Sequence, residues 1–304
     1  MSKDRSEAGD RSDRAASGAI IMAGAPVAEA LLAGVADRVA RLAADGATVG
    51  LGTILVGDDP ASAGYIRKKH EACAAVGIRS FHQELAADAT QDQVRAAVEA
   101  FNDDPGVDAF LVQNPFPRGL DYNAAIAAVD PAKDADGLHP TNLGLLALGV
   151  TDAPLACTPA GIVAMLAHYE VPVEGRNVVI VGRGTTIGRP LSLLLSQKRP
   201  GANAAVTLVH TGVADWAEYT RRADIVVGGA GVANMIGPDH VRPGAAVVGA
   251  GITWEGKRLL SDVDETVGEV AGWVTPRLGG VGPTTVAMLL ANAVSAARRR
   301  AAAS

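Results

Sequence analysis

The sequence predicts an α/β protein of two domains, the second built on a Rossmann-like, doubly wound parallel sheet. The chain has 304 residues, and single hydrophobic cores stop growing near ~250 to 300 residues. Hydrophobic residues make up 48% of the chain and aromatic residues only 4%, with 35 glycines. This composition is typical of Ala- and Leu-rich helices packed on Val and Ile strands, and apolar runs alternate with helical patterns along the chain.

Charge and cysteine content exclude several classes of protein. The net charge of −6 argues against a general nucleic-acid binder, while leaving room for a local basic pocket. No apolar run reaches the roughly 18 residues of a membrane span, and the six histidines form no pair at metal-ligand spacing. We therefore expect no nucleic acid, membrane or metal as a partner. Cys73 and Cys157 lie far apart, which favours reduced thiols in a cytoplasmic protein.

The first 18 residues mix charged residues with Ser and Gly, and they are expected to form a solvated, disordered tail. A secretory signal over Ala19 to Ala28 is the alternative. Acidic residues among the preceding charges, and Glu29 soon after, argue against that signal.

The first domain is predicted to begin with a helix over Val27 to Ala44 and a buried strand over Val49 to Val56. A second helix, about Ala61 to Val76, places Tyr65 and Lys69 on one face, four residues apart. An amine then lies beside an aromatic ring. This arrangement suits either a catalytic pair or a lysine whose aliphatic chain covers the ring.

Two further strands are predicted, at Ile78 to Leu85 and Asp108 to Gln113, and between them Thr90 and Gln93 form a capping box for a helix. Gln113 ends its strand at the carboxyl edge of a parallel sheet, where open α/β sheets bind ligands. Hydrogen bonding to a neighbouring loop is the alternative role for this amide.

After a short helix over Asn123 to Val129, a polar loop carries Asp134 and Asp136 two residues apart. This spacing suits a magnesium ion, a substrate anchor or a simple turn, and by itself it favours the turn. Thr158 is expected to cap the next helix, with Pro159 at the first helical position.

The second domain is predicted to open on the buried strand Val178 to Val181, followed by a glycine-rich turn and a helix from Pro190 to about Lys198. Gly182, Gly184 and Gly188 would let backbone N–H groups and the helix start hold a pyrophosphate. Three residues rather than two precede the last glycine, so a plain strand-to-helix turn is an equal alternative.

Later segments continue the alternation of strands and helices and indicate the cofactor. The next strand ends in His210-Thr211-Gly212, without the Asp or Glu that binds the ribose hydroxyls of NAD. Arg183 in the glycine turn could meet a phosphate on that ribose, which favours NADP over NAD. The predicted elements are strands at Ala205 to Val209, Ile225 to Gly228 and Ala245 to Gly249, and a helix near Trp216 to Arg222.

A long C-terminal helix follows the loop from Gly279 to Thr285. Its apolar stripe is expected to pack back onto the first domain and to close a cleft between the two domains.

Six motifs, taken in order, resemble those of the bifunctional methylenetetrahydrofolate dehydrogenase/cyclohydrolase family from about Ile20 to Arg300. Their number and order argue against chance agreement. The motifs are Val56 to Ser62 with Tyr65 and Lys69, Leu111 to Gln113, Lys133 to Gly137, Cys157 to Pro159, Gly182-Arg183, and Gly279 to Pro283.

The resemblance implies a folate-binding catalytic domain over residues 19–156 and 283–304, an NAD(P)-binding domain over residues 157–282, and a homodimer. It implies an enzyme of one-carbon metabolism that serves purine biosynthesis. Such an enzyme oxidises methylenetetrahydrofolate with NADP, or NAD, and then hydrolyses methenyltetrahydrofolate to formyltetrahydrofolate.

The resemblance also assigns roles to residues. Lys69 would be the central catalytic residue, Tyr65 would stack along the folate, Gln113 would support the lysine, and Asp136 would anchor the pterin. A semi-buried lysine beside an amide can lower its pKa and move protons near neutral pH. Further substrate-binding residues implied are Gly279, Gly280 and Pro283. The cofactor-binding residues implied are Gly182, Arg183, Gly184, Thr185, Thr186, Ile187, Gly188, His210, Thr211, Cys157 and Ile252.

The sequence departs from the family pattern near the expected ligand walls, so two alternatives stay open. One is a catalytically weakened paralogue that binds folate or dinucleotide, and the other is a two-domain dehydrogenase for a different small substrate. The main departures are Ala23-Gly24-Ala25 for Asp-Gly-Lys, Asn114 to Pro117 for Leu-Pro-Leu-Pro, Gly184 for Ser, Gly249-Ala250-Gly251 for Asp-Val-Gly, Ser261-Asp262-Val263 for Gly-Asp-Val, and Arg277-Leu278 for Val-Pro.

Overall fold

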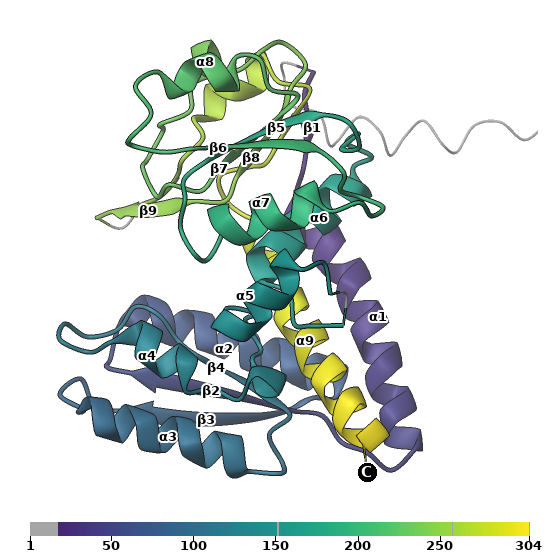
Figure 1. Ribbon diagram of the computed structural model, residues 1–304, viewed down its shortest axis with the longest axis vertical. Helices are drawn as coiled ribbons and strands as arrows, with labels where there is room; N and C mark the ends of the chain where they lie inside the picture. The colour runs from purple at the N-terminus through teal and green to yellow at the C-terminus, as the bar shows by residue number, and fades with distance from the viewer. Residues whose placement is uncertain (1–17, 151, 257, 304) are drawn as a thin grey trace, which may run out of the picture. The chain divides into compact units, whose positions relative to one another are not determined.

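The computed structural model describes residues 18–150, 152–256 and 258–303, which fall into two compact α/β units (Figure 1). The six-stranded unit contains the described residues up to Val27 together with Thr158–Thr285. The three-stranded unit contains Ala28–Cys157 and the chain from Val286 onward. Of the predicted tail, residues 1–18, all but Gly18 lie outside the described residues. Two α/β domains are thus confirmed.

The three-stranded unit is organised around β2 (Gly50–Val56), which is buried along its whole length. It pairs in parallel with β3 (Arg79–Leu85) on one side and β4 (Ala109–Val112) on the other, so that Ile54 faces both Gln83 and Val112. A central parallel strand needs apolar residues on both faces, which explains the sequence Gly-Leu-Gly-Thr-Ile-Leu-Val.

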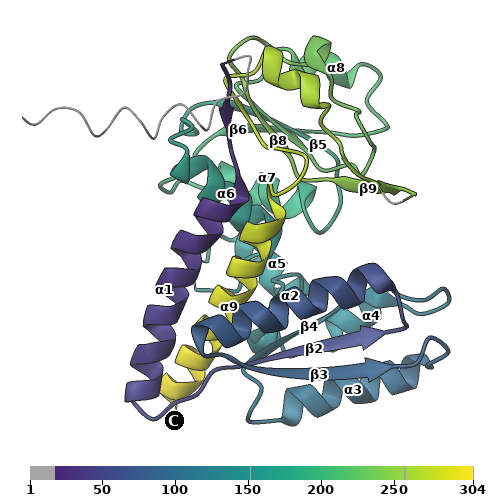
Figure 2. The same ribbon diagram turned by 180° about the vertical axis from the view of Figure 1, so that it is seen from behind.

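Helices cover both faces of this sheet and create two separate cores (Figures 1 and 2). One core joins β2 to α1, α2 and α9, through residues such as Cys73 and Leu290. The other joins the opposite face to α3 and α4, through residues such as Phe110 and Val98. The helices of this unit are α1 (Gly24–Ala44), α2 (Pro60–Val76), α3 (Gln91–Asp103), α4 (Tyr122–Ala127), η1 (Pro131–Lys133), α5 (Pro140–Ala147) and α9 (Gly282–Ala303), of which the first and last begin in the other unit.

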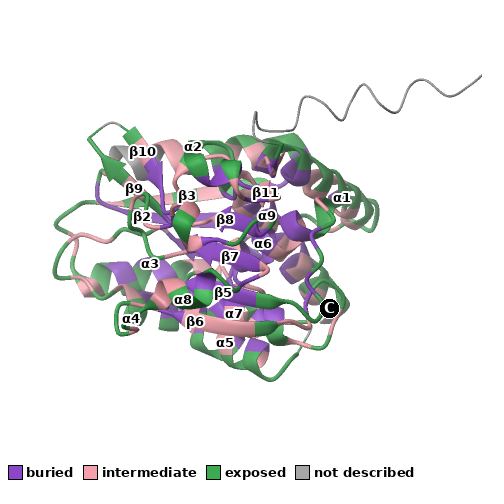
Figure 3. Ribbon diagram, turned by 90° about the horizontal axis from the view of Figure 1, so that it is seen from above, coloured by how far each residue is buried: buried purple, intermediate pink, exposed green. Residues whose placement is uncertain are grey.

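The six-stranded unit holds a fully parallel sheet in the order β1-β11-β8-β7-β5-β6. Its interior strands β5, β7 and β8 are buried, whereas the edge strand β6 is partly exposed (Figure 3). The strands are β1 (Ile20–Ile21), β5 (Asn177–Val181), β6 (Ala205–Val209), β7 (Ile225–Gly228), β8 (Ala246–Gly249) and β11 (Trp273–Val274).

The strand order reverses direction between β5 and β7, because the chain leaves β5 towards β6 and returns to the other side of β5 as β7. Ligands of open α/β sheets bind outside the carboxyl ends of strands at such a point. The remaining elements are α6 (Cys157–His168), α7 (Gly188–Ser196), α8 (Trp216–Thr220), η2 (Pro238–His240), η3 (Glu265–Glu269), and an antiparallel hairpin of β9 (Ile252–Glu255) and β10 (Arg258–Ser261).

Most predicted elements agree with the structure within a few residues, and the capping box of Thr90 and Gln93 is present in α3. Three predictions need correction. Residues 19–27 were expected in the first domain, but β1 pairs with β11 and therefore belongs to the six-stranded unit. Thr158 is not an N-cap, because α6 already begins at Cys157. Helix α7 begins at Gly188, two residues before Pro190.

Within the described part of the chain, every helix is too short or too polar to cross a membrane.

Candidate active site

Lys69 is the central polar group of the three-stranded unit. It lies on α2 one helical turn after Tyr65, and its Nζ is 4.8 Å from the centre of the Tyr65 ring. Nζ also donates a hydrogen bond of 3.0 Å to Oε1 of Gln113. The structure therefore brings together three of the residues predicted for catalysis, two from a helix face and one from a strand end.

Burial controls the protonation of Lys69, whose exposed fraction is only 5%. Loss of hydration lowers the pKa of this amine, while the nearby carboxylate of Asp136 opposes the shift. A lowered pKa means that a larger share of the amine is neutral near pH 7 than for an exposed lysine. Such a group can accept a proton and return it.

Gln113 is fixed by the strand that precedes it. Its backbone N–H extends the β2–β4 ladder by donating to the Ile54 carbonyl at 2.8 Å. Its side-chain Nε2 donates to the Asn114 carbonyl at 2.7 Å, which turns Oε1 towards Lys69. Oε1 of Gln113 is thus an oriented acceptor for Lys69, while Nε2 is held by the Asn114 carbonyl.

The two carboxylates of the predicted loop have different functions. Asp134 is buried and organises the loop, because its Oδ1 accepts from Gly137 N–H at 2.9 Å and its Oδ2 accepts from His139 N–H and Asn142 Nδ2 at 2.8 and 2.9 Å. Lys133 ties the start of the loop to three carbonyl groups at the end of α3. Asp134 therefore stabilises the turn that the spacing predicted. The hydrogen bonds of Asp134 across this loop hold Asp136 in place.

Asp136 is electrostatically coupled to the lysine. Burial raises the pKa of this carboxyl group, the positive charge of Lys69 lowers it, and repulsion from Asp134 raises it again. Burial and the charge of Asp136 also raise the pKa of the Tyr65 and Tyr122 phenols, which stay protonated. Tyr122 was missed in the sequence because nothing in its local pattern marks its proximity to Asp136.

Asn292 of α9 is a second residue that sequence reasoning missed. Its Nδ2 lies 2.9 Å from the carbonyl oxygens of both Ala135 and Leu155, and Sγ of Cys157 lies 3.3 Å from the same Ala135 carbonyl. These contacts clamp the chain beside Asp136. Burial and the carboxylate of Asp136 raise the pKa of the Cys157 thiol. Cys157, predicted to bind the cofactor, thus packs in the unit that contains Lys69.

The glycine turn of the six-stranded unit is shaped by close backbone approach. Gly182 has φ of 123°, and a Cβ there would overlap the Gly229 carbonyl, while one at Gly188 would overlap the Gly182 carbonyl. Only glycine fits at these two positions. At Gly184 no protein atom lies within 4 Å of an added Cβ. The space in front of Gly184 is therefore open, as a phosphate-binding turn requires.

The basic residue of this turn lies beside the end of the neighbouring strand. Nη1 of Arg183 is 3.5 Å from Nε2 of His210, and Nδ1 of His210 accepts from Gly212 N–H at 3.1 Å. The turn from Gly182 to Gly188 and the segment His210-Thr211 follow the adjacent parallel strands β5 and β6 at the same edge of the sheet. Ile252, the remaining residue predicted at the cofactor, begins β9 and is 56% exposed.

The departures at Gly249 and Ser261 have a steric explanation, and close contacts also explain two glycines that the family pattern shares, Gly251 and Gly24. A Cβ at Gly249 would overlap Oγ of Ser261, and one at Gly251 would overlap the carboxylate of Asp262. A side chain at position 249 would therefore require the Ser261 hydroxyl to move. Likewise, a Cβ at Gly24 would overlap the Gly280 carbonyl, and Gly24 N–H donates to the Gly279 carbonyl at 2.7 Å.

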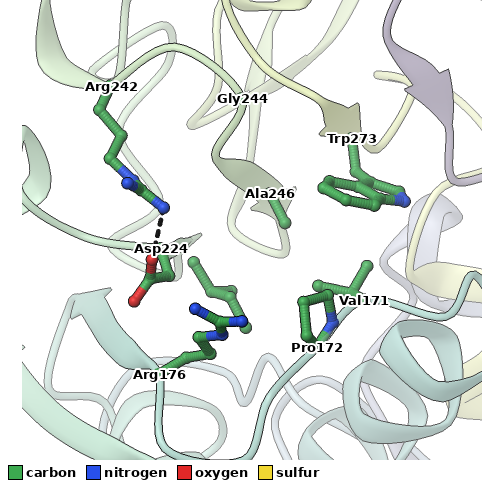
Figure 4. A pocket seen from close by; sticks show the side chains of 9 residues that line it. Val171, Pro172, Arg176, Asp224, Arg242, Gly244, Ala246 and Trp273 are labelled. Carbon is green, nitrogen blue, oxygen red and sulfur yellow. Dashed lines mark hydrogen bonds and ion pairs between the residues drawn. The ribbon is translucent and has the colours of Figure 1, made fainter.

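A separate cavity of about 170 Å³ opens at the amino ends of the strands in the six-stranded unit (Figure 4). Its lining includes Trp273, Arg176 and the ion pair of Arg242 with Asp224. Its volume is below the roughly 300 Å³ of a small-molecule site, and it lies at the edge opposite the glycine turn. The described residues contain no group of three His, Cys, Asp or Glu side chains that could hold a metal ion.

Two family models match the chain, one for a catalytic domain and one for an NAD(P)-binding domain. Residues 22–136 match the catalytic domain of tetrahydrofolate dehydrogenase/cyclohydrolase, and residues 156–301 match its NAD(P)-binding domain. The chain is 59% identical over 281 residues to the bifunctional protein FolD of Syntrophotalea carbinolica, covering 92% of this chain and 97% of that protein. It is 58% identical over 276 residues to bifunctional protein FolD 1 of Salinispora tropica, covering 91% and 90%.

Solved structures give the same result. FolD from Campylobacter jejuni superposes with a TM-score of 0.87 at 36% identity, covering 92% of this chain and 99% of that one. FolD from Trypanosoma brucei, solved with NADP and an inhibitor, superposes with a TM-score of 0.87 at 34% identity, covering 93% and 98%. The chain therefore belongs to the tetrahydrofolate dehydrogenase/cyclohydrolase family.

Proposed function

We propose that this protein oxidises methylenetetrahydrofolate to methenyltetrahydrofolate with NADP and then hydrolyses that product to formyltetrahydrofolate. The observation that carries the proposal is the buried Lys69, which is hydrogen-bonded to Gln113, adjacent to the Tyr65 ring and coupled to Asp136. A buried amine with one oriented acceptor and a nearby carboxylate suits proton transfer at a substrate rather than structural support.

In the oxidation step, NADP supplies the hydride acceptor, and the protein positions the folate. Tyr65 offers a ring face on which the planar pyrimidine ring of the pterin can stack. Asp136 offers a carboxylate to the pterin, whose pyrimidine ring presents N–H donors along one edge. No side chain of the site has to change its redox state.

In the hydrolysis step, Lys69 moves protons. Neutral Lys69 takes a proton as the water oxygen bonds to the methenyl carbon. The resulting ammonium then gives that proton to the leaving nitrogen as one carbon–nitrogen bond breaks. The second water proton leaves to solvent, and the formyl group stays on the other nitrogen. Gln113 holds the amine in place throughout this exchange.

The cofactor residues are proposed from the glycine turn. Open space over Gly184 admits the pyrophosphate, and the segment from Gly182 to Gly188 provides its backbone cradle. Arg183 is proposed to bind the 2′-phosphate of NADP, and its contact with His210 supports this role. Thr185, Thr186, Thr211 and Ile252 complete the proposed cofactor set, and Gly279, Gly280 and Pro283 are proposed to contact the folate.

We also propose a cytoplasmic homodimer. Trp254 on the β9–β10 hairpin is 57% exposed, which suits a contact with a second subunit. Two buried, unbridged cysteines suit a reducing compartment.

Sedimentation should give twice the chain mass of 30.9 kDa, and a monomer at micromolar concentration would rule the dimer out. Cell fractionation tests the compartment.

Cofactor choice tests the proposed dehydrogenase. With methylenetetrahydrofolate, kcat/KM for NADP should exceed that for NAD by at least about tenfold, because one charge-assisted contact from Arg183 is at stake. Arg183→Gln should remove most of this preference, while Arg222→Gln, an exposed arginine of the same unit, should retain it. Absence of reduction with either cofactor, from folded protein, would refute the activity.

Replacing the lysine tests the proposed hydrolase. Lys69→Met should lower the rate of methenyltetrahydrofolate hydrolysis by at least about 100-fold, since general acid–base catalysis is lost. Lys68→Met changes the preceding, exposed lysine of α2 and should hydrolyse normally. Hydrolysis by Lys69→Met at the rate of Lys68→Met would show that Lys69 has no catalytic role.

A further inference from the structure

We propose that Asp262 is a positioning residue of the dinucleotide site and that its buried carboxylate holds the loop from Ala230 to Val232 as one wall of that site. The proposal rests on NADP binding by the six-stranded unit and goes beyond the proposed catalytic groups. Asp262 itself is only 1% exposed, so it acts through the loop rather than on the cofactor.

Three backbone N–H groups converge on this carboxylate. Oδ2 accepts from Ala230 at 2.6 Å and from Gly231 at 3.1 Å, and Oδ1 accepts from Val232 at 2.8 Å. Three successive N–H groups without a buried acceptor would be costly, and a carboxylate binds such donors more strongly than a neutral group does. The loop conformation therefore depends on both oxygens of Asp262.

The loop lies where the dinucleotide is expected. It follows β7, which pairs directly with β5 at the reversal of strand order. It also packs on the glycine turn, because a Cβ at Gly182 would approach Ala230 N, and one at Gly229 would contact Ile187. A displacement of the loop would therefore change the turn that receives the pyrophosphate.

The surroundings leave the carboxylate no freedom to move. A Cβ at Gly251 would overlap Asp262, and one at Gly228 would lie 2.9 Å from Cβ of Asp262. The Asp262 backbone N–H is also bonded to the Gly251 carbonyl at 3.1 Å. A second tie reaches the same loop, since the Thr253 hydroxyl donates to the Gly231 carbonyl at 2.6 Å. Close packing therefore accounts for Gly251 in the Gly-Ala-Gly segment and for Asp262 in the Ser-Asp-Val segment, and neither residue needs a catalytic role.

The test is Asp262→Asn in the full-length protein, with the Kd of NADP measured by calorimetry. Asparagine keeps the shape but directs an NH2 group at one side of the loop, where it meets an N–H donor. Kd should rise by at least about tenfold. Asp264→Asn is the matched control, because Asp264 caps η3 and does not contact the loop; its Kd should be that of the wild type.

Hydrolysis of methenyltetrahydrofolate needs no dinucleotide. Its rate therefore shows whether Asp262→Asn disturbs only the dinucleotide site or the whole protein. Asp262→Asn should keep the wild-type hydrolysis rate while losing NADP affinity. An unchanged Kd in folded Asp262→Asn would overturn the proposal, and so would equal losses of hydrolysis and NADP binding. Failure of the wild type to bind NADP would instead refute the proposed cofactor role of the unit.

A second variant covers the case in which Asp262→Asn does not fold. Thr253→Val removes only the hydroxyl contact to Gly231, on an exposed hairpin, and should raise the Kd of NADP by about threefold or more. A folded Thr253→Val protein with wild-type affinity would show that the loop needs no such support, and would overturn the proposal.

Discussion

Burial of one amine sets the demands that the three-stranded unit meets. Lys69 has lost nearly all contact with water, and a charged ammonium in that position is costly without compensation. Gln113 supplies a hydrogen-bond acceptor, the Tyr65 ring supplies a polarisable face, and Asp136 supplies an opposing charge. Gln113 is held by the backbone at the end of β4, and Asp136 by the loop that Asp134 organises. The site balances a neutral and a charged amine, as proton transfer requires.

The six-stranded unit meets a different demand, which is close approach of backbone segments. Gly182 and Gly188 let the turn after β5 fold tightly, and Gly228 and Gly251 make room for the carboxylate of Asp262. Around the glycine turn of this unit, the charged groups include the carboxylate of Asp262, which accepts from backbone N–H groups, and the exposed guanidinium of Arg183. The three-stranded unit thus adjusts the pKa of one side chain, Lys69. The six-stranded unit instead forms a surface of backbone N–H groups and carbonyls. Close approach also links Gly249 to Ser261, because a Cβ at position 249 would overlap the serine hydroxyl.

Local patterns were sufficient to predict what depends on local geometry. Helix periodicity placed Tyr65 and Lys69 on one face, and strand ends placed Gln113 and the glycine turn at carboxyl edges. Contacts between distant segments could not be predicted in this way. Asn292 reaches Ala135 across 157 positions of sequence, β1 joins its sheet through two residues only, and Asp262 meets its loop from 30 or more positions away. The roles of Asp134 and Asp136 were ambiguous for the same reason, because spacing alone does not show which carboxylate faces backbone N–H groups.

The central claim, that burial lowers the pKa of Lys69, can be measured directly by NMR of protein labelled at the lysine ε-carbons. The Lys69 resonance is assigned by its absence in Lys69→Arg, and its chemical shift is followed against pH. The Lys69 amine should titrate with a midpoint clearly below the roughly 10.4 of an exposed lysine. A midpoint at or above that value would contradict the claim.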